Sequence, residues 1–104
     1  MAANKTIVAR KIAKDVSVII GGKLYARQGT NVFIKCPVSG TPTPRVVWEK
    51  VGQSEPFQSQ DHTLMLTSVD VVDSGMYQCT MVNVLGNATA RTELYVGKSQ
   101  IVAS

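Results

Sequence analysis

Apolar and polar residues alternate with a period of two in a series of short runs that begins at about Val16. Such alternation predicts β-strands with one face in a core and the other in solvent. Two later runs, 76–82 and 89–96, are expected to form the last strand pair, joined through residues 83–87. The residues expected to point inward from the earlier runs are Val16, Val18, Ile20, Leu24, Ala26, Val32, Ile34, Cys36, Val46, Trp48, Leu64 and Leu66. Seven or more short strands with this spacing predict a β-sandwich.

Glycine and proline separate the runs. Gly21-Gly22 is expected to form a turn that shifts the strand, and Gln28-Gly29-Thr30 a second turn. Residues 39–44 are expected to form a loop, because their two prolines cannot donate hydrogen bonds to a strand ladder. The polar stretch 51–61 is expected to hold at most short edge strands.

Two cysteines, one tryptophan and one tyrosine form the most specific pattern in the chain. Cys36 and Cys79 each lie at an inward position of a strand, and Trp48 lies on a third strand where its indole can cover paired sulfurs. Tyr77 precedes the second cysteine by two residues, which is the position of a tyrosine corner. The full run is Leu64-x-Leu66-x-x-Val69-x-x-x-Asp73-x-Gly75-x-Tyr77-x-Cys79.

This pattern clearly resembles the immunoglobulin superfamily, and the intermediate (I-set) type within it. Gly40-Thr41-Pro42-Thr43-Pro44 and Val82-Asn83-x-x-Gly86 are similar to the I-set pattern at the corresponding places. The stretch between Trp48 and Cys79 is too short for the extra strand pair of a variable domain. The resemblance covers roughly residues 16–97 and implies an all-β fold, an immunoglobulin-like β-sandwich of two antiparallel sheets with one inter-sheet cysteine pair. The residues implied to build its core and corner are Trp48, Tyr77, Leu66, Asp73 and Gly75.

The sequence departs from the family at the corner. Members often carry an arginine or lysine near the start of the fourth strand, where it pairs with the corner aspartate. Residues 58–61 offer no such base, so Asp73 is expected to bond local backbone instead.

The charge of the chain is concentrated before its first strand. The formal net charge is +4, and Lys5, Arg10, Lys11 and Lys14 precede a nearly neutral remainder. We therefore expect an N-terminal arm or linker at 1–15, one domain at 16–97 and a C-terminal tail at 98–104. The body shows no basic face interleaved with aromatic residues, so nucleic acid is not an expected partner. No apolar run is long enough for a membrane span, so direct membrane insertion is not expected either.

Convergent catalytic groups are scarce. The single histidine, His62, lies beside Asp61 at the start of a strand and is expected to be an ordinary edge-strand side chain. There is no nucleophile elbow, C-x-x-C motif, paired histidine or glycine-rich phosphate loop. The chain is therefore expected to be non-enzymatic, with no catalytic residue, metal ligand or cofactor.

Function is then expected on the surface, where three candidates stand out. Val84 and Leu85 lie at the tip of the last hairpin and can anchor a protein partner, or Leu85 can fold back onto the sandwich end. Arg45, Lys50 and Arg91 can gather into a patch for sulfated glycans or acidic proteins, or remain scattered solvated charges. The exposed edges of the sandwich can pair between copies and give homodimers.

The cysteines and the glycosylation sequons bear on the cellular compartment. Two cysteines at disulfide positions suggest an oxidising environment. Two glycosylation sequons, at Asn87 and Asn4, also favour a location outside the cell. The leading hypothesis is an extracellular module, secreted or cell-surface, of an adhesion, receptor or matrix protein, which mediates protein–protein contact or spaces other domains. One alternative is an intracellular structural domain of a muscle or cytoskeletal filament protein with reduced thiols. Another is a glycosaminoglycan-binding matrix module that uses the arm cations with the surface arginines.

Overall fold

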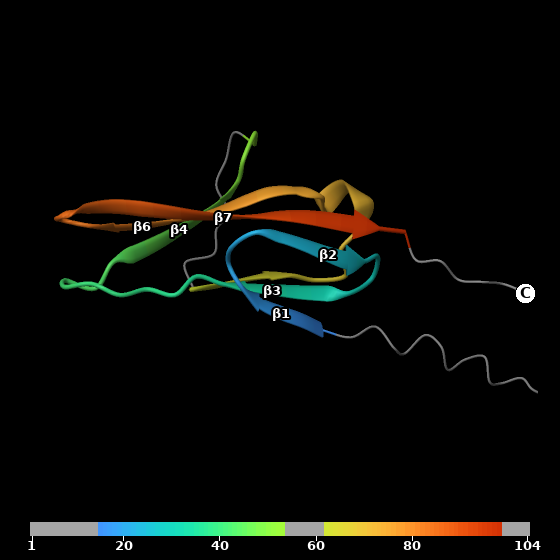
Figure 1. Ribbon diagram of the computed structural model, residues 1–104, viewed down its shortest axis with the longest axis horizontal. Helices are drawn as coiled ribbons and strands as arrows, with labels where there is room; N and C mark the ends of the chain where they lie inside the picture. Colours follow the sequence, from blue (N-terminus) through green and yellow to red (C-terminus); the bar gives the residue numbers. More distant parts are fainter. Residues whose placement is uncertain (1–14, 54–61, 99–104) are drawn as a thin grey trace, which may run out of the picture.

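The computed structural model describes residues 15–53 and 62–98. Two β-sheets pack face to face around one core (Figure 1). The sequence-based expectations for the basic arm, Asn4 and residues 54–61 lie outside the described residues.

The first sheet has three strands and the second has four. Sheet order is β1-β3-β5 in the first and β2-β7-β6-β4 in the second. The strands are β1 (Asp15–Ile19), β2 (Lys23–Arg27), β3 (Asn31–Lys35), β4 (Arg45–Lys50), β5 (Thr63–Leu66), β6 (Gly75–Asn83) and β7 (Gly86–Gly97), with the short 3-10 helix η2 (Val71–Asp73) before β6. This architecture confirms the predicted all-β immunoglobulin-like sandwich.

Each sheet is antiparallel except at one edge. β1 runs parallel to β3, and β2 runs parallel to β7, whereas all other neighbours are antiparallel. The chain changes sheet at the glycine pair that the sequence marks as a strand-shifting turn. Backbone hydrogen bonds of 2.9 Å hold this turn to both sheets, from Ile20 N to Lys35 O and from Glu93 N to Gly22 O. The turn also reverses the direction of the chain, which the alternation of apolar residues did not predict.

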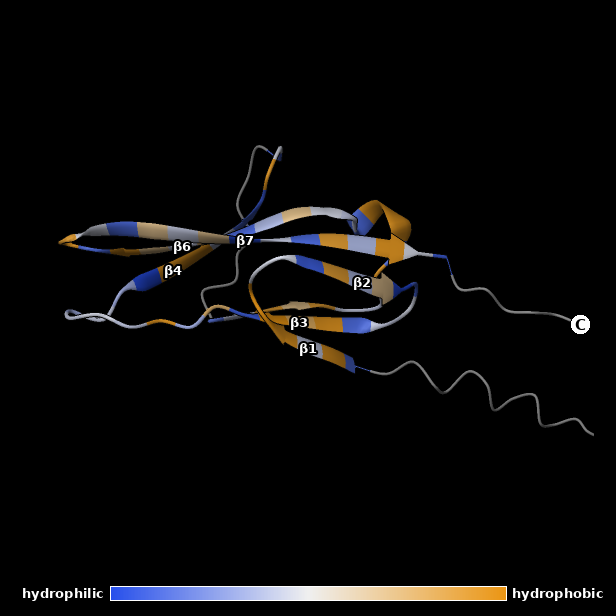
Figure 2. Ribbon diagram, in the orientation of Figure 1, coloured by the Kyte–Doolittle hydropathy of each residue, from blue (hydrophilic) through white to orange (hydrophobic). Residues whose placement is uncertain are grey.

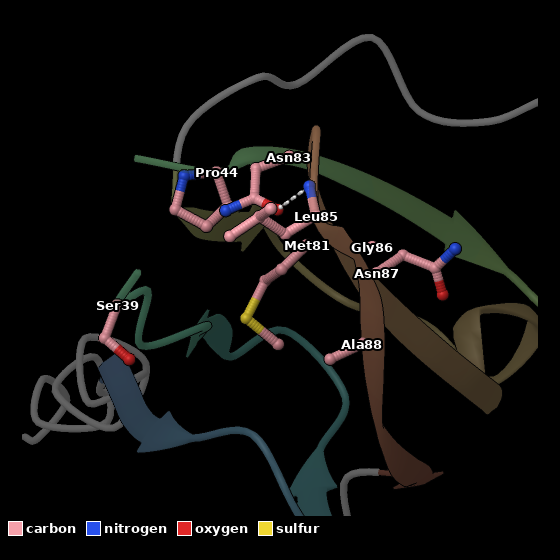
Figure 3. A pocket seen from close by; sticks show the side chains of 8 residues that line it. All are labelled: Ser39, Pro44, Met81, Asn83, Leu85, Gly86, Asn87 and Ala88. Atoms are coloured by element: carbon pink, nitrogen blue, oxygen red, sulfur yellow. Dashed lines mark hydrogen bonds between the residues drawn. The ribbon is translucent and has the colours of Figure 1, made fainter. Parts of the chain in front are cut away.

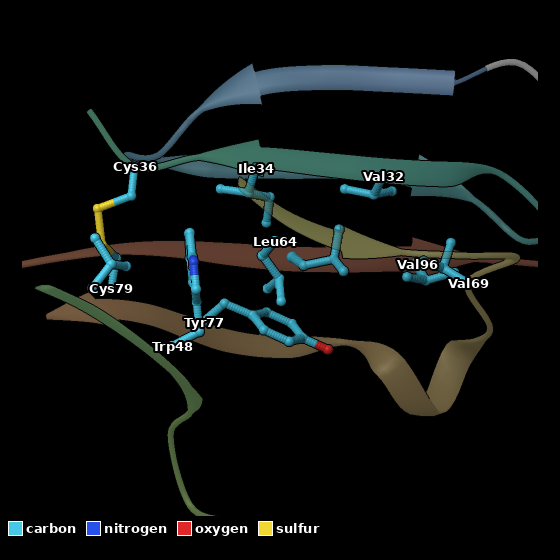
Figure 4. Packing of buried hydrophobic residues seen from close by; sticks show 11 residues of the cluster. Val32, Ile34, Cys36, Trp48, Leu64, Val69, Tyr77, Cys79 and Val96 are labelled. Atoms are coloured by element: carbon cyan, nitrogen blue, oxygen red, sulfur yellow. A yellow bond between two sulfur atoms is a disulfide. The ribbon is translucent and has the colours of Figure 1, made fainter. Parts of the chain in front are cut away.

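The core lies between the sheets and is centred on Trp48, whose side chain stands beside the Cys36–Cys79 disulfide (Figure 4). Both cysteines and the tryptophan have no exposed surface. The buried hydrophobic residues are Val32, Ile34, Cys36, Val46, Trp48, Leu64, Val69, Tyr77, Cys79, Leu94 and Val96. The predicted inward residues of β1 and β2, together with Leu66 of β5, are only half-buried.

The corner before β6 is held by short-range hydrogen bonds. The Tyr77 hydroxyl donates to Asp73 O at 2.6 Å, and this contact forms the tyrosine corner. Asp73 Oδ2 accepts from Asp70 N at 2.8 Å, so the corner aspartate bonds local backbone, as the missing base in 58–61 led us to expect. Gly75, at φ +151°, leaves the space that the Lys50 side chain fills.

Apolar residues also reach the surface at particular places (Figure 2). The tip of the β6–β7 hairpin is hydrophobic, and so is the outer side of η2, where Val72 is 78% exposed. The hairpin tip lies at the opposite end of the sandwich from the Gly97 end of β7 (Figure 1).

Candidate functional site

The β6–β7 hairpin turns within two residues. Asn83 pairs with Gly86, so only Val84 and Leu85 lie between the strands. Asn83 Oδ1 accepts a hydrogen bond from Leu85 N at 2.8 Å, and Asn83 Nδ2 donates to Pro42 O at 2.9 Å. One side chain thus shapes the turn and ties it to the loop between β3 and β4. The connection is shorter than the predicted 83–87 because strand pairing continues further than the alternation indicated.

The two turn residues project into solvent. Val84 is 85% exposed and Leu85 is 79% exposed. Leu85 therefore does not fold back into the core. Full burial of an aliphatic side chain of this size stabilises a complex by about 1.5–3 kcal/mol, so this tip is an energetically costly surface to leave in water.

A shallow, open hollow of about 280 Å³ lies beside the tip (Figure 3). Its lining comes from the loop after β3, from β6 and from the start of β7, and comprises Ser39, Pro44, Met81, Asn83, Leu85, Gly86, Asn87 and Ala88. The Met81 and Ala88 side chains reach into the hollow, because they share the inward face of the hairpin. The hollow is smaller and more open than enclosed small-molecule sites, which have volumes of about 300–1,000 Å³. It suits a protruding side chain of a protein partner better than a cofactor.

Within the described residues, the two segments that form this end of the sandwich carry no charged side chain. The two segments that form it, 39–44 and 83–88, contain no acidic or basic residue, and the first charged neighbour is Arg45. Contacts made here are therefore expected to be apolar and insensitive to salt.

Asn87, the sequon residue, is exposed on β7 opposite Val82. Its side chain points away from Met81 and Ala88 (Figure 3). A group attached to Asn87 would thus extend from the outer face of the four-stranded sheet, beside the hollow that this residue helps to line.

The three cations proposed as a patch do not gather. Arg45 is at the start of β4, and Lys50 is at its other end. Lys50 Nζ donates to Val72 O at 2.9 Å and lies 5.7 Å from the Tyr77 ring centroid, so it covers the tyrosine corner. Lys50 follows Trp48 by two residues, so both point to the same, inner side of the strand. This spacing in the sequence could have indicated that Lys50 lies over the tyrosine corner.

The third cation, Arg91, belongs to a polar row across the outer face of the four-stranded sheet. Arg91 Nε donates to Gln78 Oε1 at 2.6 Å, and Gln78 Nε2 donates to Glu49 Oε2 at 3.0 Å. The row runs over three neighbouring strands, because Glu49 pairs with Gln78 and Gln78 with Arg91. Arg91 is therefore balanced by an acid two strands away.

An exposed aromatic pair was missed by the sequence analysis. The Tyr25 and Tyr95 rings stack with centroids 5.0 Å apart and an interplanar angle of 16°, and Tyr25 is 71% exposed. The parallel pairing of β2 with β7 places them opposite each other, and nothing in the sequence indicates that pairing. A hydrogen bond with Glu93 raises the pKa of Tyr95. Glu93 pairs with Lys23 across the two strands, so an acidic residue lies beside the basic residues Lys23 and Arg27 of β2.

His62 is exposed next to β5, and its backbone O accepts from Cys36 N at 2.7 Å. Within residues 15–53 and 62–98, no group of three His, Cys, Asp or Glu side chains could hold a metal ion. The same described residues include no helix that is long and apolar enough to cross a membrane.

Two packed sheets, a buried tryptophan against an inter-sheet disulfide and a tyrosine corner define an immunoglobulin-like domain. More particularly, the chain belongs to the immunoglobulin I-set family, whose family model matches residues 16–96.

The curated relatives are much longer than this chain. Human ADAMTS-like protein 3 is 36% identical over 96 residues, which cover 86% of this chain and 6% of the relative. Mouse hemicentin-2 is 37% identical over 75 residues, which cover 65% of this chain and 2% of the relative. Human vascular cell adhesion protein 1 is 27% identical over 97 residues, which cover 90% of this chain and 13% of the relative. The chain thus spans only a small fraction of each of these relatives.

Solved structures support the fold. Titin domain M7 superimposes with a TM-score of 0.66 at 22% identity, covering 75% of this chain and 88% of that structure. The tandem Ig repeats of Dlar give a TM-score of 0.62 at 29% identity, and the match covers 77% of this chain and 46% of that structure. The domain is accordingly similar in sequence to a protein named for adhesion and similar in fold to a titin domain.

Proposed function

We propose that this chain is a non-enzymatic contact module of a larger extracellular adhesion, receptor or matrix protein. It binds a protein partner through the hairpin end, defined here as residues 39–44 and 83–88. The observation that carries the proposal is the exposure of Val84 and Leu85, at 85% and 79%, beside an uncharged hollow. Exposed apolar residues gathered beside a hollow are typical of protein-contact sites.

Three observations favour a location outside the cell. The two cysteines form a disulfide, a bond that persists in oxidising compartments. Asn87 is exposed within its sequon and is accessible to a glycosylating enzyme. A vascular cell adhesion protein is among the relatives.

The competing function is an intracellular structural domain of the filament type, and similarity to titin domain M7 is in keeping with it. Mass spectrometry of the parent protein from its native source separates the two. A Cys36–Cys79 linkage, with added mass at Asn87, is expected. Free thiols and an unmodified Asn87 would favour the filament-type role instead.

A binding screen against purified secreted and cell-surface ectodomains tests the contact site itself. A Val84→Ser/Leu85→Ser double variant is expected to lose roughly a hundredfold in affinity for a partner found with the wild-type chain, because two aliphatic side chains lose their burial. The matched control is Ile19→Ser/Met65→Ser, which removes apolar residues of similar exposure, 66% and 57%, on the outer face of the other sheet. Equal loss in both variants would argue against the hairpin end.

The glycosaminoglycan alternative predicts a different dependence on salt. Binding to a sulfated glycan releases counterions, so its affinity falls steeply as NaCl is added. An uncharged contact at the hairpin end is expected to change little. Heparin binding that persists without salt sensitivity would count against the glycan role, and steep salt dependence of all binding would count against the hairpin end.

Self-pairing through the edge strand β2 is disfavoured by charge. An antiparallel pair of two copies centred on Tyr25 would place Lys23 of one copy opposite Arg27 of the other. Like charges directly opposite each other destabilise a strand pair. We therefore propose a different protein, not a second copy on this edge, as the partner.

A further inference from the structure

The strand β2 lies at the border of the four-stranded sheet. Within the described residues, its only strand neighbour in that sheet is β7, which it meets in parallel from Lys23–Glu93 to Arg27–Gly97. A border strand presents a row of backbone N–H and C=O groups that have no ladder partner, so it can accept a further strand. The side of β2 that faces away from β7 is therefore a candidate binding surface.

Hydrogen bonds at the two ends of β2 show which of its backbone groups face β7. Glu93 N donates to Gly22 O at 2.9 Å, and Gln28 N donates to Gly97 O at 2.8 Å. The register between the two strands has no offset, and the backbone groups of successive residues in a strand point to opposite sides. The even-numbered positions of β2 therefore face β7, and the odd-numbered positions face away from it.

Lys23, Tyr25 and Arg27 thus direct their backbone groups away from the sheet. Arg27 O accepts from Thr30 N at 3.1 Å in the following turn, which leaves both groups of Lys23 and Tyr25 and the N–H of Arg27 for a further strand. The three side chains lie on the outer face of the sheet, since the two residues between them pack against the core. We call this surface, defined by Lys23, Tyr25 and Arg27, the β2 edge.

The Tyr25 ring is ordered by its neighbours on β7. One face of the ring stacks on the Tyr95 ring, with centroids 5.0 Å apart, and Tyr95 forms a hydrogen bond with the Glu93 side chain. The other face of the Tyr25 ring lies on the side away from β7, and the residue is 71% exposed. A side chain opposite Tyr25 on an added strand would cover this face. Little conformational entropy is lost in that contact, because the stack already restricts the ring.

Charge determines which strands the β2 edge can accept. Lys23 and Arg27 flank Tyr25 on the same face of the strand. On β7, Lys23 has Glu93 opposite, whereas Arg27 has Gly97, so the two cations outnumber the acid. A basic strand or a second copy of β2 would bring like charges together and destabilise the pair. Acidic side chains at the same two positions would stabilise it.

We propose that the β2 edge is a second contact site, which binds an extended acidic segment of a partner protein as an added strand. The segment carries acidic residues opposite Lys23 and Arg27 and an apolar residue opposite Tyr25. This pattern, acid-x-apolar-x-acid, is symmetric, so a strand of either direction places an acid beside each cation. The β2 edge is separate from the hairpin end, and the proposal does not depend on the function of that end.

Titration of the 104-residue chain with a synthetic peptide tests the proposal. The probe is a capped peptide with threonine at alternate positions and glutamate, valine and glutamate between them. On binding, hydrogen exchange is expected to slow at the amides of Lys23, Tyr25 and Arg27. The amides of Leu24 and Ala26, which already face β7, should change little. Absence of saturable binding, or binding without this alternating protection, would overturn the proposal.

A second peptide tests the selection by charge. It has lysine in place of both glutamates and is otherwise the same. Because two favourable charge pairs become two unfavourable ones, its affinity is expected to be at least about tenfold lower. Equal affinities of the two peptides would contradict an acidic partner.

A pair of variants tests the backbone contact. Tyr25→Pro removes an N–H that faces away from β7, and proline is tolerated in a border strand. Tyr25→Ala removes the same ring but keeps the N–H, so it is the matched control. The proline variant is expected to bind the glutamate peptide about fivefold more weakly than the alanine variant. Equal affinities would contradict strand addition. If the proline variant does not fold, the exchange pattern of the wild-type chain decides.

A heparin tetrasaccharide separates strand addition from glycan binding. Its sulfates can pair with Lys23 and Arg27, but it cannot form a backbone ladder. Binding of the tetrasaccharide at β2 without binding of the peptide would overturn the proposal and assign the surface to a glycan.

The hairpin variant separates this proposal from the proposed function. Val84→Ser/Leu85→Ser is expected to bind the glutamate peptide as tightly as wild type. If it does, and also binds every partner from the ectodomain screen as tightly as wild type, the β2 edge is supported and the contact function of the hairpin end fails. If it loses the peptide as well, the two surfaces are not separate, which contradicts the proposal.

Discussion

Trp48 sits where the two sheets are covalently joined, on β4 directly opposite Cys79 of β6 (Figure 4). No part of its side chain reaches the surface. Replacement by alanine would leave a cavity that the disulfide prevents the sheets from closing. We expect Trp48→Ala to lower the free energy of unfolding by about 3–5 kcal/mol, measured by urea denaturation.

Val84→Ala is the control for the Trp48 variant, because Val84 is 85% exposed. Its effect on the unfolding free energy is expected to stay within about 0.5 kcal/mol. A Trp48→Ala variant with the same midpoint as this control would show that the indole does not support the core.

Tyr77 links the stability of the domain to alkaline pH. Burial, together with the nearby Asp73 carboxylate, raises the pKa of Tyr77 from 10.0 to about 12. The folded state therefore holds the phenol proton more tightly than the unfolded state does. The stability that this proton contributes is complete below pH 10 and is lost as pH rises toward 12. Absorbance of tyrosinate should show one residue titrating near pH 12, and unfolding midpoints should fall over the same interval.

Tyr77→Phe provides the comparison. It removes the hydroxyl that donates to Asp73 O, which costs about 1 kcal/mol at neutral pH. It also removes the titrating group, so the decline between pH 10 and 12 should become shallower. An identical decline in both proteins would assign the alkaline instability to other groups.

The strands show which parts of the fold can be predicted from local sequence. Period-two alternation identified the inward residues of β3, β4 and β5, because burial of one face imposes that period. Alternation is the same for parallel and antiparallel neighbours, so it could not give the direction of β1 or the pairing of β2 with β7. Those depend on the turn at Gly21-Gly22 and on strands distant in sequence.

Surface residues, too, could be predicted only where local sequence determines their position. Val84 and Leu85 could be found from sequence, because a turn between two strands lies at the end of a sandwich. The Tyr25–Tyr95 stack could not, since the two residues meet only through the β2–β7 pairing. Arg91 could not be assigned either, because its partner row depends on strand register.

The turn between β1 and β2 can be tested at one glycine. Gly22 has φ +64°, the left-handed region where a Cβ is unfavourable, although nothing lies within 4 Å of the position a Cβ would take. Gly22→Ala should therefore cost about 1–2 kcal/mol through backbone strain alone. Urea denaturation gives the cost, and hydrogen exchange at the β1 amides shows whether that strand loosens first.

Gly97→Ala is the matched change for this turn. Its Cβ would also meet open space, and its φ lies outside the left-handed region. Its expected cost is within about 0.5 kcal/mol. Equal costs at the two glycines would mean that the β1–β2 turn does not depend on a left-handed residue, and would weaken the case for the reversed β1.

At the scale of the whole molecule, the disulfide ties the two sheets and closes a loop with a sequence separation of 43. In the chain-entropy model, closing a loop of this length stabilises a domain by about 4 kcal/mol. Domains are typically stable by only about 5–15 kcal/mol, so this bond accounts for a large share of the total. The stability of the domain is therefore expected to depend on this bond to a degree that a purely packed core would not.

Unfolding of the oxidised chain and of a Cys36→Ala/Cys79→Ala variant measures that dependence. We expect the variant to lose about 4 kcal/mol, with a small further loss from the two missing sulfurs. Chemical reduction of the wild-type chain should give nearly the same change, and because it leaves the sulfurs in place, it isolates the bond. A large loss would make a reducing compartment a poor location for the domain and would support the extracellular role. If the reduced chain kept its full stability, packing around Trp48 alone would hold the sheets together, and the filament-type role would gain from the result.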